Sequence, residues 1–179
     1  DVWFLYTPSV TGLATITAGG FDTIVSVYTG DCSSPEQIAC NNDYASVEAT
    51  VSVPVTAGEP LLILVAGNGD TQGSGGLTIS AVASPANDTC DGAASVGVGT
   101  TSFSTRGANT GDPFPLCVIP SDQFYNDVWF SFVSPGDGDV VVSTCGSLFD
   151  TLLAVYDGPT CPDGSLPERV CDDDSCSDG

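Results

Sequence analysis

The sequence FDTIVSVYTGDC at residues 21–32 returns as FDTLLAVYDGPTC at residues 149–161. In each stretch apolar and small residues follow the F-D-T motif, and a Gly follows the Tyr. This is the pattern of a buried β-strand that runs into a turn. The two stretches lie 128 residues apart, and the DVWF at Asp1 returns 126 residues later at Asp127. Matches in the same order indicate an internal repeat.

A third pair of matching stretches extends the repeat, because CNNDYAS at Cys40 corresponds to CDDDSCS at Cys171. The period of about 130 residues is too long for a solenoid unit and fits a whole domain. The segment SPANDTCDGA, which starts at Ser84, has the composition of a linker and a domain start. We therefore expect residues 1–84 to be the rear part of one domain and residues 85–179 to be the front part of the next.

Strand patterns dominate both parts of the chain. LATIT at residues 13–17 and VEATVSVPV at residues 47–55 alternate apolar with small or polar residues, the period-2 mark of a half-buried strand. LLILVAG at residues 61–67 is a short apolar run that fits a sandwich core. Further strands are expected in GLTISAVA (76–83), DVVVST (139–144) and TLLAVYDG (151–158). Turn residues separate the strands at intervals of about 8–12 residues, which predicts an all-β fold of tandem antiparallel, jelly-roll-like β-sandwiches, each incomplete here.

The charge balance restricts the partners and the chemistry. Arg106 and Arg169 are the only basic side chains, and the formal net charge is −21. Nucleic acids and anionic membranes are excluded as partners, because both require Lys or Arg to neutralise phosphate. The chain has no His, which excludes Ser-His-Asp and Cys-His catalysis. We expect a protein that is not an enzyme, and a surface that attracts cations.

The eight cysteines predict disulfide bonds, because the chain has no His and no C-x-x-C motif that would favour zinc. Disulfides require an oxidising compartment, so we expect a secreted bacterial protein, extracellular or at the cell surface. The sequence has no apolar run of about 18 residues, and we expect export to use a segment outside these residues. Matching positions in the two repeats predict the pairs Cys32–Cys40 and Cys161–Cys171. Cys145 and Cys176 are both missing from the first copy, which suggests that they pair, and Cys90–Cys117 is the pair that remains.

The motifs D-x-W-[FY]-x-[FY], F-D-T-x-x-x-V-Y and C-x-D-D together resemble the bacterial pre-peptidase C-terminal (PPC)-like β-sandwich family. The similarity is greatest to the Cys-containing tandem modules of large secreted and surface proteins, and it covers nearly the whole chain. It implies an extracellular, non-catalytic module that is jelly-roll-like and often stabilised by calcium. It implies no single ligand. The two Trp residues of the first motif, Trp3 and Trp129, are predicted to anchor the core, with ligand stacking as the alternative.

CDDDSC at residues 171–176 holds three carboxylates on one short loop. Two carboxylates 4 Å apart repel by about 4 kcal/mol at an effective dielectric near 20, and a bound cation would relieve this repulsion. Oxygen ligands from a loop suit calcium. The alternative is a solvated acidic loop. The predicted calcium ligands are Asp150, Asp172, Asp173 and Asp174 in the second copy, and Asp22, Asn41, Asn42 and Asp43 in a weaker site of the first copy.

The sequence supports two hypotheses about the function. The first is a structural protein of calcium-stabilised repeats in a surface filament, stalk or matrix, with further copies or adjacent repeats as head-to-tail partners. The alternative is a carbohydrate- or protein-binding module of a secreted enzyme, which exposed aromatic rings at Tyr44, Phe124 and Tyr125 would favour. Asn87 begins an N-x-T sequon that could carry a sugar or could simply form a turn.

The repeat also suggests what surrounds the chain. We expect a covalent polyprotein whose repeats pack into a fibre, with strand donation between chains as the second choice. In the polyprotein, a stretch similar to residues 44–67 would follow Gly179.

Overall fold

The computed structural model describes residues 1–42, 47–109, 125–158, 160–162, 168–173 and 175–176. It divides the chain into two compact units, Asp1–Ser84 and Pro85–Gly179. The dividing point coincides with the boundary between the two domain parts in the sequence. No helix among the described residues is long and apolar enough to cross a membrane.

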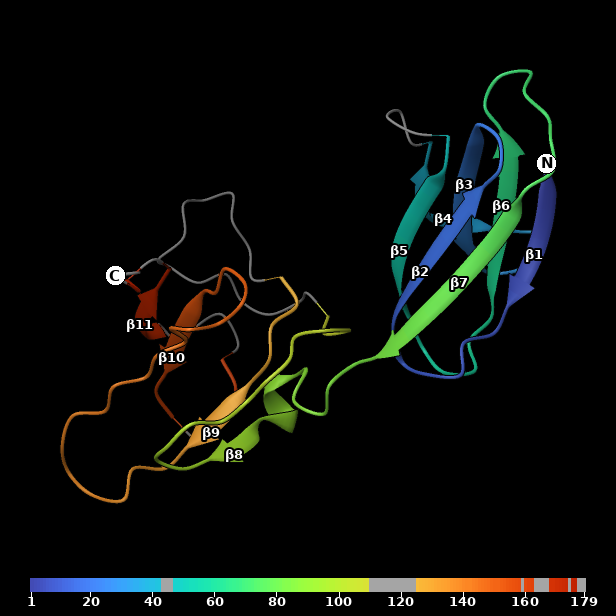
Figure 1. Ribbon diagram of the computed structural model, residues 1–179. Coiled ribbons are helices and arrows are strands. Elements are labelled where there is room, and N and C mark those ends of the chain that lie inside the picture. Colours follow the sequence, from blue (N-terminus) through green and yellow to red (C-terminus); the bar gives the residue numbers. More distant parts are fainter. Residues whose placement is uncertain (43–46, 110–124, 159, 163–167, 174, 177–179) are drawn as a thin grey trace. The chain divides into compact units, whose positions relative to one another are not determined.

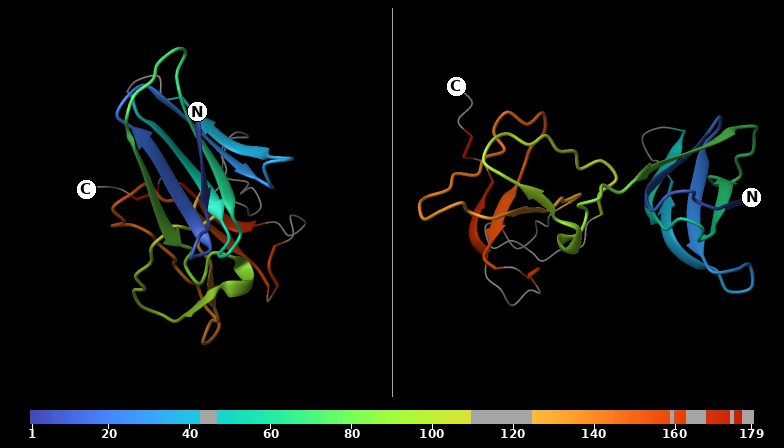
Figure 2. Two further views of the ribbon diagram at one scale, coloured as in Figure 1. Left: turned by 90° about the vertical axis from the view of Figure 1, so that its right-hand side faces the viewer. Right: turned by 90° about the horizontal axis from the view of Figure 1, so that it is seen from below.

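The first unit is an antiparallel β-sandwich, as the alternating patterns predict (Figure 1). One sheet has the strand order β1-β6-β3-β4 and the other has the order β5-β2-β7. The two sheets lie face to face in the turned views of Figure 2. The strands are β1 (Val2–Tyr6), β2 (Gly12–Gly19), β3 (Thr23–Thr29), β4 (Glu36–Asn41), β5 (Ala49–Val55), β6 (Leu61–Gly67) and β7 (Gly76–Ala83).

The core of the first unit lies between these two sheets. Strand β2 buries every second residue, and so does β5, which matches the period-2 pattern of their sequences. In β6 the same alternation is hidden inside a continuous apolar run. The buried cluster consists of Ala14, Ile16, Ala18, Val25, Val27, Ala49, Val51, Val53, Val55, Leu61, Ile63 and Val65.

The second unit contains short elements and little core. They are the 3-10 turn η1 (Cys90–Gly92), β8 (Ala94–Val96), β9 (Phe130–Phe132), β10 (Leu153–Tyr156) and β11 (Glu168–Asp172). Strand β8 pairs with β9 in parallel, unlike the antiparallel pairing expected from the sequence, whereas β10 and β11 are antiparallel. Among the described residues of this unit, Ala108 is the one buried hydrophobic side chain.

The two repeated hairpins have the same register. Ser26 pairs with Cys40 in the β3–β4 hairpin, and Ala154 pairs with Cys171 in the β10–β11 hairpin. A register shift interrupts each ladder directly before the Tyr that both hairpins share, between Val27 and Tyr28 in one and between Val155 and Tyr156 in the other. The repeat in the sequence is thus also a repeat of local structure.

The expected strand at residues 139–144 is absent, although this segment lies within the described residues. Its counterpart in the first unit is β2, which is held between β5 and β7. No strands equivalent to β5 and β7 occur among the described residues of the second unit, so the segment has no ladder to join. Val140 is 52% exposed and Val142 is 53% exposed, whereas their counterparts Ala14 and Ile16 are fully buried.

The disulfides differ in part from the predicted pairs. The bond between Cys145 and Cys176 is present. Cys90 bonds with Cys161 instead of Cys117, which makes the predicted Cys90–Cys117 and Cys161–Cys171 pairs wrong. Cys171 is also disulfide-bonded. Cys117 lies outside the described residues.

The predicted Cys32–Cys40 bond is also wrong, because both residues are exposed free thiols. The segment between them forms a strand, not the closed loop that was expected. Cys40 lies four residues beyond Glu36, the first residue of β4, and is therefore about 13 Å along the strand from the turn that holds Cys32. A disulfide requires Cα atoms within about 7 Å of each other.

Candidate functional site

The repeated F-D-T motif has a structural role in the first unit. Thr23 is buried, its hydroxyl donates a hydrogen bond to the carbonyl oxygen of Ala18 over 2.9 Å, and it accepts one from the amide of Ala49 over 3.3 Å. Ala18 and Ala49 belong to the opposite sheet, so Thr23 links the two layers. The Thr of the motif thus acts as a buried polar connection between the two sheets.

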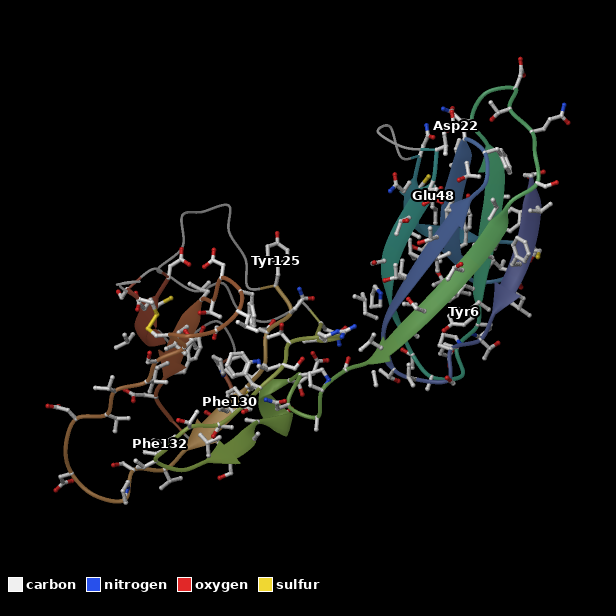
Figure 3. All side chains as sticks on the ribbon, viewed as in Figure 1. Tyr6, Asp22, Glu48, Tyr125, Phe130 and Phe132 are labelled. Carbon is white, nitrogen blue, oxygen red and sulfur yellow. A yellow bond between two sulfur atoms is a disulfide. The ribbon has the colours of Figure 1, made fainter. Side chains whose placement is uncertain are left out.

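Asp22, the predicted calcium ligand of the same motif, holds a loop. Its carboxylate accepts a hydrogen bond from the Asn68 side chain over 3.2 Å. Its carbonyl oxygen accepts bonds from the Asn68 amide over 3.0 Å and from the Thr71 hydroxyl over 3.1 Å. These bonds fix the turn that follows β6, and Figure 3 shows Asp22 at that end of the sandwich.

The other predicted ligands of the first copy do not gather around Asp22 in the described structure. The Asn41 side chain donates a hydrogen bond to the carbonyl oxygen of Thr50 over 2.6 Å, which links β4 to β5. Asn42 is exposed. Asp43 lies outside the described residues.

In the second copy, three of the four predicted ligands are described. Asp172 ends β11 and accepts a hydrogen bond from the Ser175 hydroxyl over 2.6 Å. Asp150 and Asp173 are exposed. Asp174 lies outside the described residues. Within the described ranges, no group of three or more acidic, Cys or His side chains could hold a metal. The calcium sites therefore remain a prediction.

Asn87 is used as a connector in the second unit. Its side chain donates a hydrogen bond to the carbonyl oxygen of Trp129 over 3.0 Å, and its own carbonyl accepts the Trp129 amide over 2.8 Å. The neighbouring Asp88 is buried and accepts two bonds of 2.6 Å from Asn109. These contacts favour the turn interpretation of the sequon.

The exposed turn before β4 contains Asp31, whose carboxyl group has a lowered pKa. The side chain of Asp31 accepts hydrogen bonds from the Ser33 hydroxyl, the Ser33 amide and the Ser34 amide. Because these donors favour the charged form, they hold the pKa of Asp31 below its ordinary value of 3.8. The group shapes the turn before β4.

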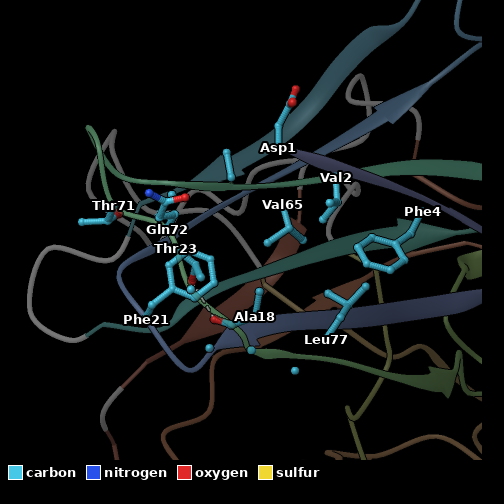
Figure 4. Close-up of a pocket in the computed structure, with 16 residues that line it drawn as sticks. Asp1, Val2, Phe4, Ala18, Phe21, Thr23, Val65, Thr71, Gln72 and Leu77 are labelled. Atoms are coloured by element: carbon cyan, nitrogen blue, oxygen red, sulfur yellow. Dashed lines mark hydrogen bonds between the residues drawn. The ribbon is translucent and has the colours of Figure 1, made fainter.

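A pocket of about 250 Å³ opens in the first unit between the edge strands β1 and β7 (Figure 4). Its wall is largely apolar and includes the rings of Phe4 and Phe21 and the side chain of Leu77. Thr71 and Gln72 add polar groups from the loop after β6. This pocket was not predicted, because its walls come from strands distant in sequence.

Aromatic rings are exposed in the second unit. Tyr125, one of the three residues chosen to distinguish a binding module, is 68% exposed and projects from the surface in Figure 3. Tyr44 and Phe124 lie outside the described residues. The rings of Phe103, Phe130 and Phe149 form a cluster in which Phe103 meets each of the other two edge-on.

Trp3 is not a core anchor, contrary to the prediction, and Trp129 is half-buried. Trp3 is 47% exposed, and its ring packs against Tyr28 with 5.3 Å between ring centroids. The second copy repeats this pair, with Trp129 at 5.7 Å from Tyr156. In the β1–β6 register Trp3 lies opposite Leu64, and the buried cluster takes the alternate residues of β6. The Trp3 ring therefore covers the outer face of the sheet.

Residues 86–171 match the model of a family described as galactose binding domain-like and associated with T9SS, the type IX secretion system. The match covers most of the second unit and none of the first. It supports a β-sandwich-type accessory domain and does not specifically support the PPC-like family that the motifs resemble. No curated protein and no solved structure matches the chain.

Proposed function

We propose that the chain is a non-catalytic part of a secreted or cell-surface protein and that its second unit is an accessory module that binds sugar. The observation that carries this proposal is the match of residues 86–171 to a galactose binding domain-like, T9SS-associated family. The absence of His from the sequence and the number of cysteines agree with a non-catalytic exported protein.

Exposed aromatic side chains support sugar binding in this unit. A planar ring with its face in solvent can stack on the apolar face of a sugar, and the Tyr hydroxyl can add a hydrogen bond. Tyr125 is 68% exposed and lies inside the matched segment. It is therefore our first choice for a sugar contact.

Galactose titration of the full chain, followed by two-dimensional NMR, tests the proposal. We expect saturable shifts with galactose and smaller shifts with glucose, which differs at one hydroxyl. Tyr125→Ala should weaken binding by about tenfold or more, equivalent to about 1.4 kcal/mol. Leu148→Ala is the matched control, because Leu148 is a fully exposed aliphatic residue of the same unit. Unchanged spectra with every monosaccharide tested would contradict the proposal.

A second candidate function is that of a structural repeat in a surface filament or matrix, stabilised by calcium. The duplicated hairpin register and the duplicated Trp–Tyr ring pair favour it, because they indicate two copies of one domain type in one chain. Electron microscopy of the native protein distinguishes the candidates. Extended filaments would favour the structural role, and isolated particles that bind sugar would favour the accessory module.

A further inference from the structure

In the second unit, the ring of Phe103 packs against two other rings, those of Phe130 and Phe149. Its centroid lies 6.1 Å from that of Phe130 and 6.1 Å from that of Phe149, with edge-to-face angles of 74° and 77°. Edge-to-face packing at this distance is favourable for aromatic side chains. Phe103 belongs to the front segment of the domain, whereas its two partners belong to the repeated part.

In the first unit, the counterparts of Phe130 and Phe149 line a pocket that no third aromatic ring among the described residues fills. Phe4 is the counterpart of Phe130, 126 residues earlier, and Phe21 is the counterpart of Phe149, 128 residues earlier. Both rings line the 250 Å³ pocket between β1 and β7, as Figure 4 shows. An apolar cavity of about 150 Å³ is enough to hold benzene, so this pocket has room for a phenyl ring.

The two units also differ in the strand pairing beside these rings. In the second unit β9 pairs with β8, whereas its counterpart in the first unit, β1, has an open edge among the described residues. Strand β8 runs parallel to β9, and its Ala94 amide donates to the carbonyl oxygen of Trp129 over 3.0 Å. The counterpart of β9 in the first unit is β1, which is the outermost strand of its sheet. Among the described residues no strand covers its outer edge, where Trp3 corresponds to Trp129. An open edge next to an apolar pocket is a site for strand addition.

The cysteines give an independent reason to expect a partner at this edge. The free thiol Cys32 is the counterpart of Cys161, which closes its repeated stretch in the same way. Cys161 is bonded to Cys90, four residues before the start of β8. A partner segment of the same type would bring its own Cys near Cys32.

From these four correspondences we propose that the pocket and the β1 edge of the first unit form a docking site for a segment of the same type as residues 85–109, supplied by a further repeat outside residues 1–179. Its strand adds in parallel to β1, its Phe enters the pocket between Phe4 and Phe21, and its Cys bonds with Cys32. In the last step two thiols lose two protons and two electrons to an external disulfide, which is reduced to two thiols.

The test attaches a second copy of residues 85–126 in front of Asp1 of the full chain, so that Asn126 precedes Asp1 as it precedes Asp127. The extended protein is refolded with oxidised glutathione and mapped as non-reduced peptides. We expect a new bond between the grafted Cys90 and Cys32. We also expect hydrogen exchange at the Trp3 amide to slow by about tenfold or more.

Two further variants separate the pocket from the disulfide. The graft with Cys90→Ser should still slow exchange at Trp3, because the ring and the strand remain. The graft with both Cys90→Ser and Phe103→Ser should lose this protection. Both changes are made in the grafted copy only, and residues 1–179 of the original chain stay unaltered. Misfolding of the original chain therefore cannot explain the result.

Three outcomes would overturn the proposal. The first is a grafted Cys90 that bonds elsewhere while exchange at Trp3 stays unchanged. The second is protection that survives the Phe103→Ser change. The third is protection of Trp3 in the unextended chain that increases with protein concentration, because the site would then belong to a second copy of this chain.

Discussion

Asp22 was predicted to be a metal ligand because it is the counterpart of Asp150 in the repeated F-D-T motif, yet its described contacts are those of a loop anchor. Its carboxylate and its carbonyl both hold the turn after β6. Its counterpart Asp150 is exposed in the second unit, where the described residues include no turn of this kind. The same residue type can therefore have a structural role in one copy and be available for calcium in the other.

Calcium binding can be tested residue by residue through thermal melting. A cation that binds only the folded state raises the melting temperature, so EGTA should lower it and added calcium should restore it. Asp173→Ala should remove much of this response and Asp43→Ala less of it. Asp22→Asn should leave the response unchanged, because an amide oxygen still accepts the bond from Asn68. A melting temperature that is constant across millimolar calcium would end the calcium hypothesis.

At the scale of elements, one buried hydroxyl links strand β3 to the opposite sheet. The two hydrogen bonds of Thr23 cross from β3 to backbone groups of the other sheet. The counterpart Thr151 instead shares a hydrogen bond of 2.8 Å with the side-chain hydroxyl of Thr144. Alternation of apolar residues predicted the strand itself. It could not predict this link, because the partner groups are backbone atoms of distant strands.

Replacement of Thr23 by Val tests this link with almost no change in volume. The Ala18 carbonyl and the Ala49 amide would lose their partner inside the core, and the free energy of unfolding should fall by about 1–3 kcal/mol. Thr78→Val is the control, because Thr78 lies on the exposed face of β7 and should change stability by less than about 0.5 kcal/mol. Urea denaturation measures both, and equal stability of the two variants would show that the cross-sheet bonds contribute nothing.

The hairpins explain which disulfides the sequence could predict. Cys145 and Cys176 were paired correctly because both are missing from the first copy, a relation that is visible in the sequence. The predicted bond between Cys32 and Cys40 was wrong, because Cys40 lies along strand β4, away from the turn that contains Cys32. Pairing follows distance in space, and the spacing of cysteines along the chain does not reveal it.

Alkylation of residues 1–179, produced as a separate folded chain, tests the cysteine assignments. Two thiols, Cys32 and Cys40, should react with iodoacetamide without reduction, because both are exposed. Non-reduced peptide mapping should then recover the Cys90–Cys161 and Cys145–Cys176 bonds. A chain that contains no reactive thiol, or a Cys32–Cys40 peptide, would contradict the structure.

At the scale of the whole molecule, the two units differ in completeness although their hairpins match. The described residues of the first unit form seven strands around one buried cluster. In the described part of the second unit, the counterparts of β5, β6 and β7 are absent, and Phe130, Phe149 and Val170 are 39%, 50% and 57% exposed. The all-β class followed from the sequence. The pocket and the exposed faces did not, because they depend on which strands meet in space.

The described residues of the second unit include no counterpart of the central strand β6. In the first unit, β6 lies between β1 and β3, and the rings of Trp3 and Tyr28 meet across its outer face. The counterpart rings, Trp129 and Tyr156, lie at nearly the same separation, although β9 and β10 share no sheet. The second unit thus keeps the spacing that a β6-type strand would fill.

Addition of a second copy of residues 47–84 after Gly179 should supply that strand. Its pairing with β9 and β10 would bury the apolar faces that are now exposed, so hydrogen exchange should slow at Phe132 and Val155, and the melting temperature should rise. The matched control carries Ile63→Asp in the added copy only, since Ile63 is fully buried in the first unit and a charge there prevents packing. If the two extended proteins exchange at the same rate in β9 and β10, the second unit does not accept a strand of this type.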